Sequence, residues 1–362
     1  MLISFSFRIK RIKIILLCFL KVSIIETMKE QSALYYRLIA LWVLCEAMLG
    51  GIIHGFRIPV SGLVVGSAAV ICICLIAYYV PSKGAIIKAT IIVAVFKMML
   101  SPHSPPPAYI AVFFQGLLGE LIFLQRRFYK VSCWILAILA LLESGLQRII
   151  VLTIVYGNDF WKAVNDFING LTKQKVQTNY SLYFVGAYVL LHVLVGMLVG
   201  WCAAVLPGRI AQWRLVYKEE IIPMNSDKEI KQTVNRKKKG YFKKGLLFIW
   251  ILLILLYLQS NFKIGEPLLP SHLSLKIFVR SVIIVLTWYF LAKPLVGALL
   301  KKWLEKKRSE SREDIEQIMQ LLPSTQQIIA ASWQISNKYK GLRRIVHCIK
   351  LILVNSLEKK NG

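Results

Sequence analysis

Long apolar runs separated by short polar segments make up most of this chain. A helix that crosses a membrane needs roughly 20 apolar residues in succession. No segment alternates between apolar and polar residues with a period of two, as the strands of a membrane barrel do. Because only helices or closed barrels satisfy the backbone in lipid, the pattern predicts membrane-spanning helices. Their expected positions are about 37–56, 60–80, 84–101, 106–124, 131–156, 180–205, 245–260 and 274–292.

Prolines are interpreted as marking the ends of these spans, since proline lacks the N–H that continues a helix. The prolines concerned are Pro81, Pro102, Pro105–Pro107 and Pro207. Residues 157–173 mix polar and apolar positions and predict an external amphipathic helix at the membrane interface. Trp161 and Phe167 are its expected anchors.

Lysine and arginine are concentrated in every second loop, and the loops between carry few of them. Lys/Arg bias in short loops sets the orientation of a membrane protein, with the basic loops in the cytoplasm. The pattern therefore predicts a multi-pass protein of the inner (cytoplasmic) membrane with both termini cytoplasmic. The basic segments are Lys29–Arg37, Lys83 with Lys88, Arg126–Lys130, Arg209 onward and Lys301 onward.

The predicted fold class is an all-α polytopic membrane protein. It has a six-helix transmembrane bundle, two further spans and cytoplasmic amphipathic helices. Residues 1–27 are interpreted as a mis-called start, with Met28 as the second start, or as a signal-like or extra membrane-associated helix. The other expected units are a six-span solute-binding unit at 28–206, a basic cytoplasmic linker at 207–244, and a segment at 245–362 with two spans and amphipathic helices.

Composition agrees with this class. The 362 residues are 57% hydrophobic and 18% charged, whereas soluble domains are about 25% charged. The net charge of +28 raises a nucleic-acid interpretation. Because the charge lies mainly at span ends and after Pro207, contact with anionic lipid explains it more simply, and no nucleic-acid partner is expected. The seven cysteines lie in apolar or cytoplasmic segments, so no structural disulfide is expected.

Several ionisable residues fall inside the predicted spans, where they are costly and usually face the bundle interior. Glu46, Glu120 and His192 are among them, and His192 is expected to be a satisfied core histidine. The polar groups crowd the middle and outer half of the six-span unit, which predicts an outward-facing cavity for a small polar solute with an anionic group. The alternative is internal pairing, for instance of Glu143 with Lys97 or Arg148. The candidate substrate-binding residues are His54, Arg57, Lys97, His103, Gln115, Glu143 and Arg148.

Small residues recur at four-residue spacing, which lets helices approach closely. This spacing predicts helix–helix contact faces, above all in the first two spans. The sets are Ala47/Gly51/Gly55, Gly62/Gly66 and Gly196/Gly200.

Two stretches, residues 50–62 (GGIIHGFRIPVSG) and 101–120 (SPHSPPPAYIAVFFQGLLGE), resemble the membrane substrate-binding (S) components of energy-coupling factor transporters. The resemblance covers about residues 36–206. It implies capture of a vitamin or micronutrient from outside, with ATP hydrolysis by separate cytoplasmic ATPases. It also implies docking of a transmembrane partner through small residues of the first helix, here Ala47, Gly51 and Gly55. The part at 243–362 is similar in design to the transmembrane (T) component. It departs from that pattern in lacking the short coupling signatures and in having only two spans.

The chain after the last predicted span contains amphipathic helices. The first opens at Ser309–Glu316, and its apolar residues Ile315, Ile318, Met319 and Leu322 recur at helical spacing. A second follows Pro323, and a third runs from about Leu342 to Leu357. Their apolar stripes must be buried against the membrane, one another or a partner protein.

The chain contains no P-loop, no HExxH, no GxSxG and no acidic metal pair. No enzyme activity, cofactor or metal site is predicted. The leading hypothesis is a transporter subunit that captures a small solute, with cytoplasmic ATPase subunits and a further transmembrane protein as partners. One alternative is a non-transporting membrane scaffold whose cytoplasmic helices recruit a partner protein. Another is an integral-membrane enzyme acting on lipid, for which the sequence offers no nucleophile or metal constellation.

Overall fold

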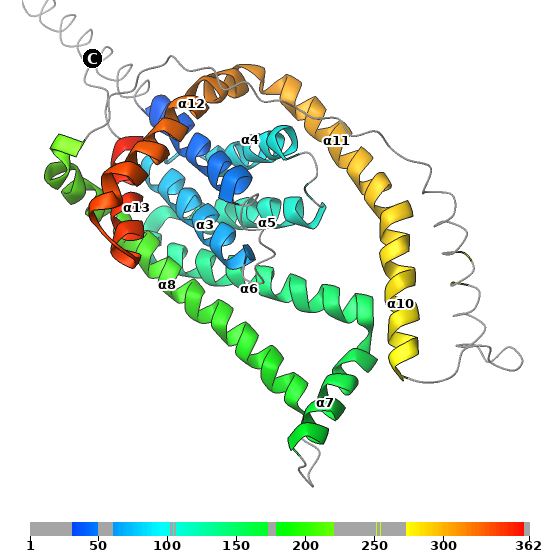
Figure 1. Cartoon of the computed structure of the whole chain (residues 1–362). Helices are drawn as coiled ribbons and strands as arrows, with labels where there is room; N and C mark the ends of the chain where they lie inside the picture. The colour runs from blue at the N-terminus through cyan, green and yellow to red at the C-terminus, as the bar shows by residue number, and fades with distance from the viewer. Residues whose placement is uncertain are drawn as a thin grey trace, which may run out of the picture.

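A computed structural model describes residues 31–49, 61–101, 104, 106–172, 179–220, 251, 254 and 273–357. These residues are helical almost throughout, and no strand occurs among them. After a first helix at 31–44, the elements are η1 (Cys45–Leu49), α3 (Ser61–Tyr79), α4 (Ala85–Leu100), α5 (Pro106–Phe123), η2 (Arg126–Phe128), α6 (Tyr129–Tyr156), α7 (Asn158–Thr172), α8 (Tyr180–Val216), η3 (Lys218–Glu220), α10 (Leu273–Thr287), η4 (Trp288–Ala292), α11 (Lys293–Glu310), α12 (Arg312–Ile335), η5 (Ser336–Lys338) and α13 (Leu342–Ser356). Figure 1 shows α3–α6 and α8 as a bundle, with α10–α11 along one side.

Five of the described helices are long and apolar enough to cross a membrane, and the prediction of an all-helical chain is confirmed. Four of the five coincide with predicted spans: Gly62–Tyr79, Pro106–Phe123, Tyr129–Tyr156 and the first part of Tyr180–Val216. The fifth is Leu275–Glu310. The predicted span at 84–101 is the shorter helix α4, and almost all of the predicted span at 245–260 lies outside the described residues. The chain is thus consistent with a multi-pass membrane protein.

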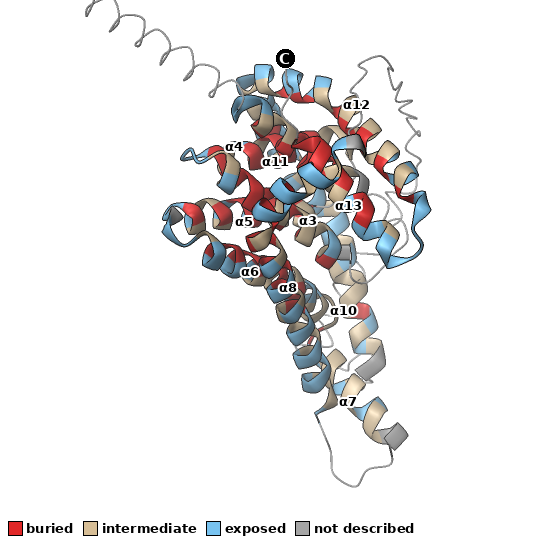
Figure 2. Ribbon diagram, turned by 90° about the vertical axis from the view of Figure 1, so that its left-hand side faces the viewer, coloured by how far each residue is buried: buried red, intermediate tan, exposed pale blue. Residues whose placement is uncertain are grey.

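The first helix and α4 lie inside the bundle. Leu38 to Leu44 are all buried, and so are Ile92 to Phe96. Consecutive residues point in all directions around a helix, so a helix buried at every position has neighbours on all sides. These two uniformly apolar segments therefore form the centre of the core, while α6 and α8 are buried mainly on one side. Figure 2 shows the buried residues concentrated where α3, α4 and α5 meet.

Glycines set the closest helix contacts, as their spacing predicts. A Cβ atom on Gly200 of α8 would lie 2.8 Å from the Cα of Trp134 on α6, and one on Gly196 would lie 2.9 Å from the Cα of Ile138. On α3, a Cβ on Gly66 would lie 3.0 Å from the Leu141 side chain. The contact faces predicted at Gly62/Gly66 and Gly196/Gly200 are confirmed. Of the first set, Ala47 lies in η1, and Gly51 and Gly55 lie outside the described residues.

The amphipathic helix predicted at 157–173 is present as α7 (Asn158–Thr172), between α6 and α8 in the chain, and its external position stays a prediction. Trp161 donates a hydrogen bond from its indole Nε1 to the Thr153 hydroxyl at 3.1 Å. Phe167 is exposed. One expected anchor therefore packs against α6, and the other lies on the surface of the protein.

Pro207 does not end a helix, so that prediction was wrong: α8 continues to Val216. A proline inside a helix has no N–H to bond the carbonyl four residues earlier. In α8 this carbonyl belongs to Ala203. The Tyr129 hydroxyl lies 3.5 Å from that carbonyl oxygen and 3.2 Å from the carbonyl oxygen of Cys74. The single hydroxyl proton is shared between these two carbonyls, so a neighbouring helix offers Ala203 a weak donor beside the proline. The helix consequently runs through the boundary expected at 206/207.

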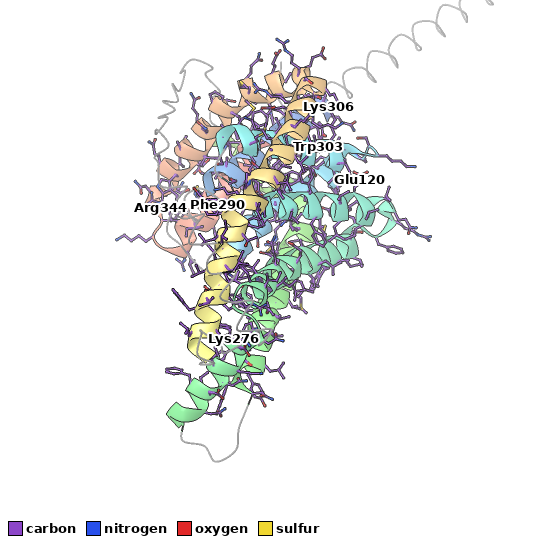
Figure 3. The ribbon with its side chains drawn as sticks, turned by 90° about the vertical axis from the view of Figure 1, so that its right-hand side faces the viewer. Glu120, Lys276, Phe290, Trp303, Lys306 and Arg344 are labelled. Atoms are coloured by element: carbon purple, nitrogen blue, oxygen red, sulfur yellow. The ribbon has the colours of Figure 1, made fainter. Side chains whose placement is uncertain are left out.

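The last predicted span also continues further than expected. Instead of ending at 292, the helix passes through the π-turn η4 and continues as α11 to Glu310. The N–H of Lys293 bonds to the carbonyl of Trp288, five residues earlier. This wider turn directly precedes Pro294 and accommodates it. Figure 3 labels Phe290, Trp303 and Lys306 along this helix, and the rings of Phe113 on α5 and Trp303 lie 5.6 Å apart.

Helices α12 and α13, which we together call the cap, pack beside the basic end of the bundle, as we call the end that carries Lys83, Lys88, Arg127, Lys130 and Arg209. Asp314 of α12 accepts hydrogen bonds from the Tyr36 hydroxyl at 2.6 Å and the Lys88 ammonium at 2.9 Å. Of the predicted apolar positions, Ile315, Ile318 and Leu322 are buried, whereas Met319 is 43% exposed. Pro323 does not divide this segment as expected, because α12 is one helix through it. Each of α12 and α13 buries one apolar face against its neighbours.

His347 of α13 joins three parts of this cap. Its Nδ1 lies 2.9 Å from the Ser336 hydroxyl, and its Nε2 lies 3.5 Å from the carboxylate of Glu220 on η3. Tyr217 and Tyr339 pack around the ring. Burial lowers the pKa of His347 below its ordinary value of 6.5, against the opposing effect of Glu220.

This lowered pKa predicts that acid loosens the cap. The folded protein binds the His347 proton less tightly than the unfolded chain does. The stability that His347 contributes is therefore present above pH 6.5 and decreases as the pH falls below it. We expect the melting temperature of the wild-type protein to decrease more between about pH 7.5 and about pH 5.5 than that of His347→Gln, which keeps a side chain able to bond Ser336. Equal decreases in the two proteins would contradict this role.

Candidate functional site

A buried ion pair lies inside the bundle. The Lys97 ammonium of α4 contacts the Glu46 carboxylate of η1 at 2.6 Å, and the two side chains are 9% and 4% exposed. Lys97 also lies 3.4 Å from the carbonyl oxygen of Ala108 and 6.0 Å from the centre of the Tyr109 ring. Charges in such an interior are tolerated when they are paired and hydrogen-bonded. The pair joins three separate elements at one point.

The backbone at Glu46 is unusual, because Cys45–Leu49 form a π-turn that continues the first helix. A π-turn adds a residue to the helical repeat and changes the direction of the side chains that follow, and such turns are frequent at functional sites. This π-turn contains Glu46, which is the one acidic residue that contacts Lys97 in the described part of the chain.

Gln115 of α5 is buried, with 3% of its surface exposed. Its Oε1 has no hydrogen-bond partner among the described residues, and its Nε2 lies 3.4 Å from the place that a Cβ atom on Gly66 of α3 would take. Glu143 of α6 is half-buried, and its Oε2 likewise has no partner in the described ranges. Unpaired buried acceptors cost free energy. These two oxygens are therefore available to a donor brought in by a solute or by water.

Two side chains contact backbone carbonyls at the start of α5, one from α6 and one from α4. Gln147 of α6 donates from Nε2 to the carbonyl of Pro107 at 3.2 Å, one residue before the Ala108 carbonyl that Lys97 approaches. The proline-rich loop before α5 contains His103, one of the candidate substrate-binding residues. Gln147 and Lys97 therefore position the helix that follows this loop.

The structure buries only part of the predicted set. Lys97 and Gln115 are buried and Glu143 is half-buried, whereas Arg148 is exposed on α6. The alternative of internal pairing joined Glu143 to Lys97 or to Arg148, whereas the structure pairs Lys97 with Glu46. Glu46 was missing from the predicted binding residues, although its mid-depth position in an outward-running span could have indicated it. The candidates outside the described residues are His54, Arg57 and His103.

Glu120 has a structural role at the basic end. Its carboxylate accepts hydrogen bonds from the backbone N–H groups of Gly84, Ile86 and Ile87 at 2.6, 3.2 and 3.4 Å. These groups begin α4 and have no partners within the helix, so Glu120 caps α4 from α5. A cavity of about 40 Å³ adjoins it, which is large enough for water and too small for a vitamin-sized solute.

His192 is a satisfied core histidine, as expected. Its Nδ1 bonds to the Tyr188 carbonyl at 2.8 Å, and its ring packs against Gly145 of α6. Across the described ranges, no group of three or more His, Cys, Asp or Glu side chains is arranged to hold a metal ion.

No protein-family model, curated protein or solved structure matches this chain. Functional inference therefore rests on the residues and their geometry.

Proposed function

We propose that this protein is the membrane subunit of a transporter that captures a small solute, of the vitamin or micronutrient class, from outside the cell. Separate ATPases would energise transport. The observation that supports this proposal most directly is the buried Lys97–Glu46 pair, close to the start of α5. A paired charge in a membrane bundle marks a substrate or ion path more often than a surface pair does.

The orientation that we propose places the basic end in the cytoplasm, following the Lys/Arg bias of the loops. The α3–α4 turn and the turn before α6 both lie at that end. Lys97, four residues before the C-cap of α4 at Ser101, then lies in the outer half of the bundle. A solute entering between the outer ends of α4 and α5 would reach Lys97 before Gln115.

Binding would proceed by exchange of partners. A carboxylate or phosphate of the solute competes with Glu46 for the Lys97 ammonium, because an anion is the favoured ligand of a buried cation. The unpaired oxygens of Gln115 and Glu143 would accept hydrogen bonds from donor groups of the same solute. This arrangement favours a solute with one anionic group and several donors.

The test is native mass spectrometry of the full-length protein, taken mildly from its own host membranes. We expect a retained small molecule together with ATPase subunits. Gln115→Leu should reduce the retained molecule by about tenfold, the effect of losing one hydrogen bond to a buried group. The matched control Gln212→Leu changes an exposed glutamine at the end of α8 and should retain the molecule fully.

A scaffold is the second candidate, supported by the compact cap that α12 and α13 form at the basic end. An empty six-helix unit that carries only other proteins, with no ATPase among them, would reject the transporter proposal in favour of the scaffold.

A further inference from the structure

Helix α13 has two apolar faces. Cys348, Leu351 and Val354 are buried on the inner face. On the outer face, apolar residues three and four positions apart form a second stripe that is exposed. Its members are Leu342 (80% exposed), Ile345 (46%), Val346 (50%) and Ile349 (50%). The packing of the cap on the bundle therefore accounts for one stripe and leaves the other uncovered.

The position of α13 along α8 gives the depth of this stripe. Lys350 lies 5.3 Å from the centre of the Trp213 ring, and His347 packs against Tyr217. Arg214 donates to the carbonyl of Leu357 just after α13. These α8 residues follow the apolar part of that helix within two to three turns. Aromatic and basic residues at the end of a membrane helix mark the headgroup region.

The charge around the stripe is basic. Lys340 and Arg343 are exposed beside its first turn, and Lys350 lies at its far end. The nearby acidic residue Glu220 is already paired with Lys338. An apolar stripe flanked by lysine and arginine is typical of helices that lie in a membrane interface. The basic residues around the stripe favour an anionic partner. The position of the stripe beside the end of α8, at the level expected for headgroups, favours lipid.

We propose that the outer face of α13 docks onto anionic lipid headgroups of the membrane in which the bundle lies. Leu342, Ile345 and Ile349 enter the boundary between headgroups and acyl chains, and Lys340 and Arg343 contact lipid phosphates. Figure 2 shows α13 on the outside of the bundle, with its residues ranging from buried to exposed. The docked helix fixes the cap to the bilayer as well as to α8.

The experiment compares amide hydrogen exchange of residues 340–350 in the full-length protein, placed in nanodiscs of phosphatidylcholine alone or with about one-third phosphatidylglycerol. We expect slower exchange in the anionic nanodiscs, by about fivefold for each basic residue that contacts them. Lys340→Gln/Arg343→Gln should abolish most of the difference between the two lipids. The matched control Lys302→Gln/Lys306→Gln removes two exposed lysines of α11 (Figure 3 labels Lys306) and should preserve it.

A second pair of variants tests the apolar stripe. Ile349→Ser should increase exchange in the anionic nanodiscs, whereas Met319→Ser, at an exposed position of α12, should leave it unchanged. Equal exchange in the two lipids for the wild-type protein would overturn the proposal. So would protection that arises only when soluble host protein is added, because the stripe would then be a protein-docking surface.

Discussion

Lys97→Met is expected to destabilise the bundle by about 3–5 kcal/mol, the cost of leaving a buried carboxylate without its partner. Glu46 is 4% exposed at its side chain and bonds Lys97 at 2.6 Å, so no solvent replaces the lost ammonium. Thermal unfolding in detergent, followed by size-exclusion chromatography, measures the effect. Lys162→Met is the control, since Lys162 is exposed beside Asp159 and such pairs contribute about 0–1 kcal/mol.

The double variant Glu46→Gln/Lys97→Met separates stability from function. Removing both charges of a buried pair is often neutral for stability, so we expect most of the lost melting temperature to return. Solute retention should not return, because Lys97 is the proposed ligand of the anionic group. A single variant as stable as wild type would contradict the ion pair, and a double variant that retains solute would contradict the binding role of Lys97.

Gly200→Val is expected to separate α8 from α6, at a cost of about 3 kcal/mol or more. A Cβ at this position would lie 2.8 Å from the Cα of Trp134 and 3.2 Å from the carbonyl oxygen of Cys133. These are backbone atoms of a buried helix and cannot rotate away as a side chain can. The expected readout is a lower melting temperature and a smaller monodisperse fraction in detergent.

Gly186→Val is the matched control for this substitution. Gly186 lies on the same helix, and a Cβ there meets no atom within 4 Å. Valine is also a slightly better helix former than glycine, so this variant should be at least as stable as wild type. If Gly200→Val matched Gly186→Val in melting temperature, the close α6–α8 contact would be refuted.

Local pattern alone predicted several of these helices well. The spans at 60–80, 106–124 and 131–156 agree with α3, α5 and α6, because apolar length and flanking polar residues are properties of the segment itself. The helix α7 agrees for the same reason, because its amphipathic pattern of polar and apolar residues is contained within its own 15 residues. The glycine spacing likewise predicted close contacts, since only small residues permit them.

Helix ends depended on residues far away in the sequence. The Ala203 carbonyl, which loses its helical partner at Pro207, lies 3.5 Å from the hydroxyl of Tyr129, a residue 78 positions before the proline. The Glu120 cap on α4 likewise comes from another helix. A rule that reads proline as a helix end cannot include such donors, because their positions follow from packing.

The sequence by itself determined the helical class, the positions of most of the long apolar helices, the basic loops and the polar residues within those helices, because each depends on composition within a short window. Only the tertiary structure decided that Lys97 pairs with Glu46, and that α12 and α13 bury one stripe on the bundle while α13 leaves another exposed. The physical reason is that ion pairs and apolar faces are satisfied by whichever element lies nearest in space, and this proximity is a property of the packed bundle.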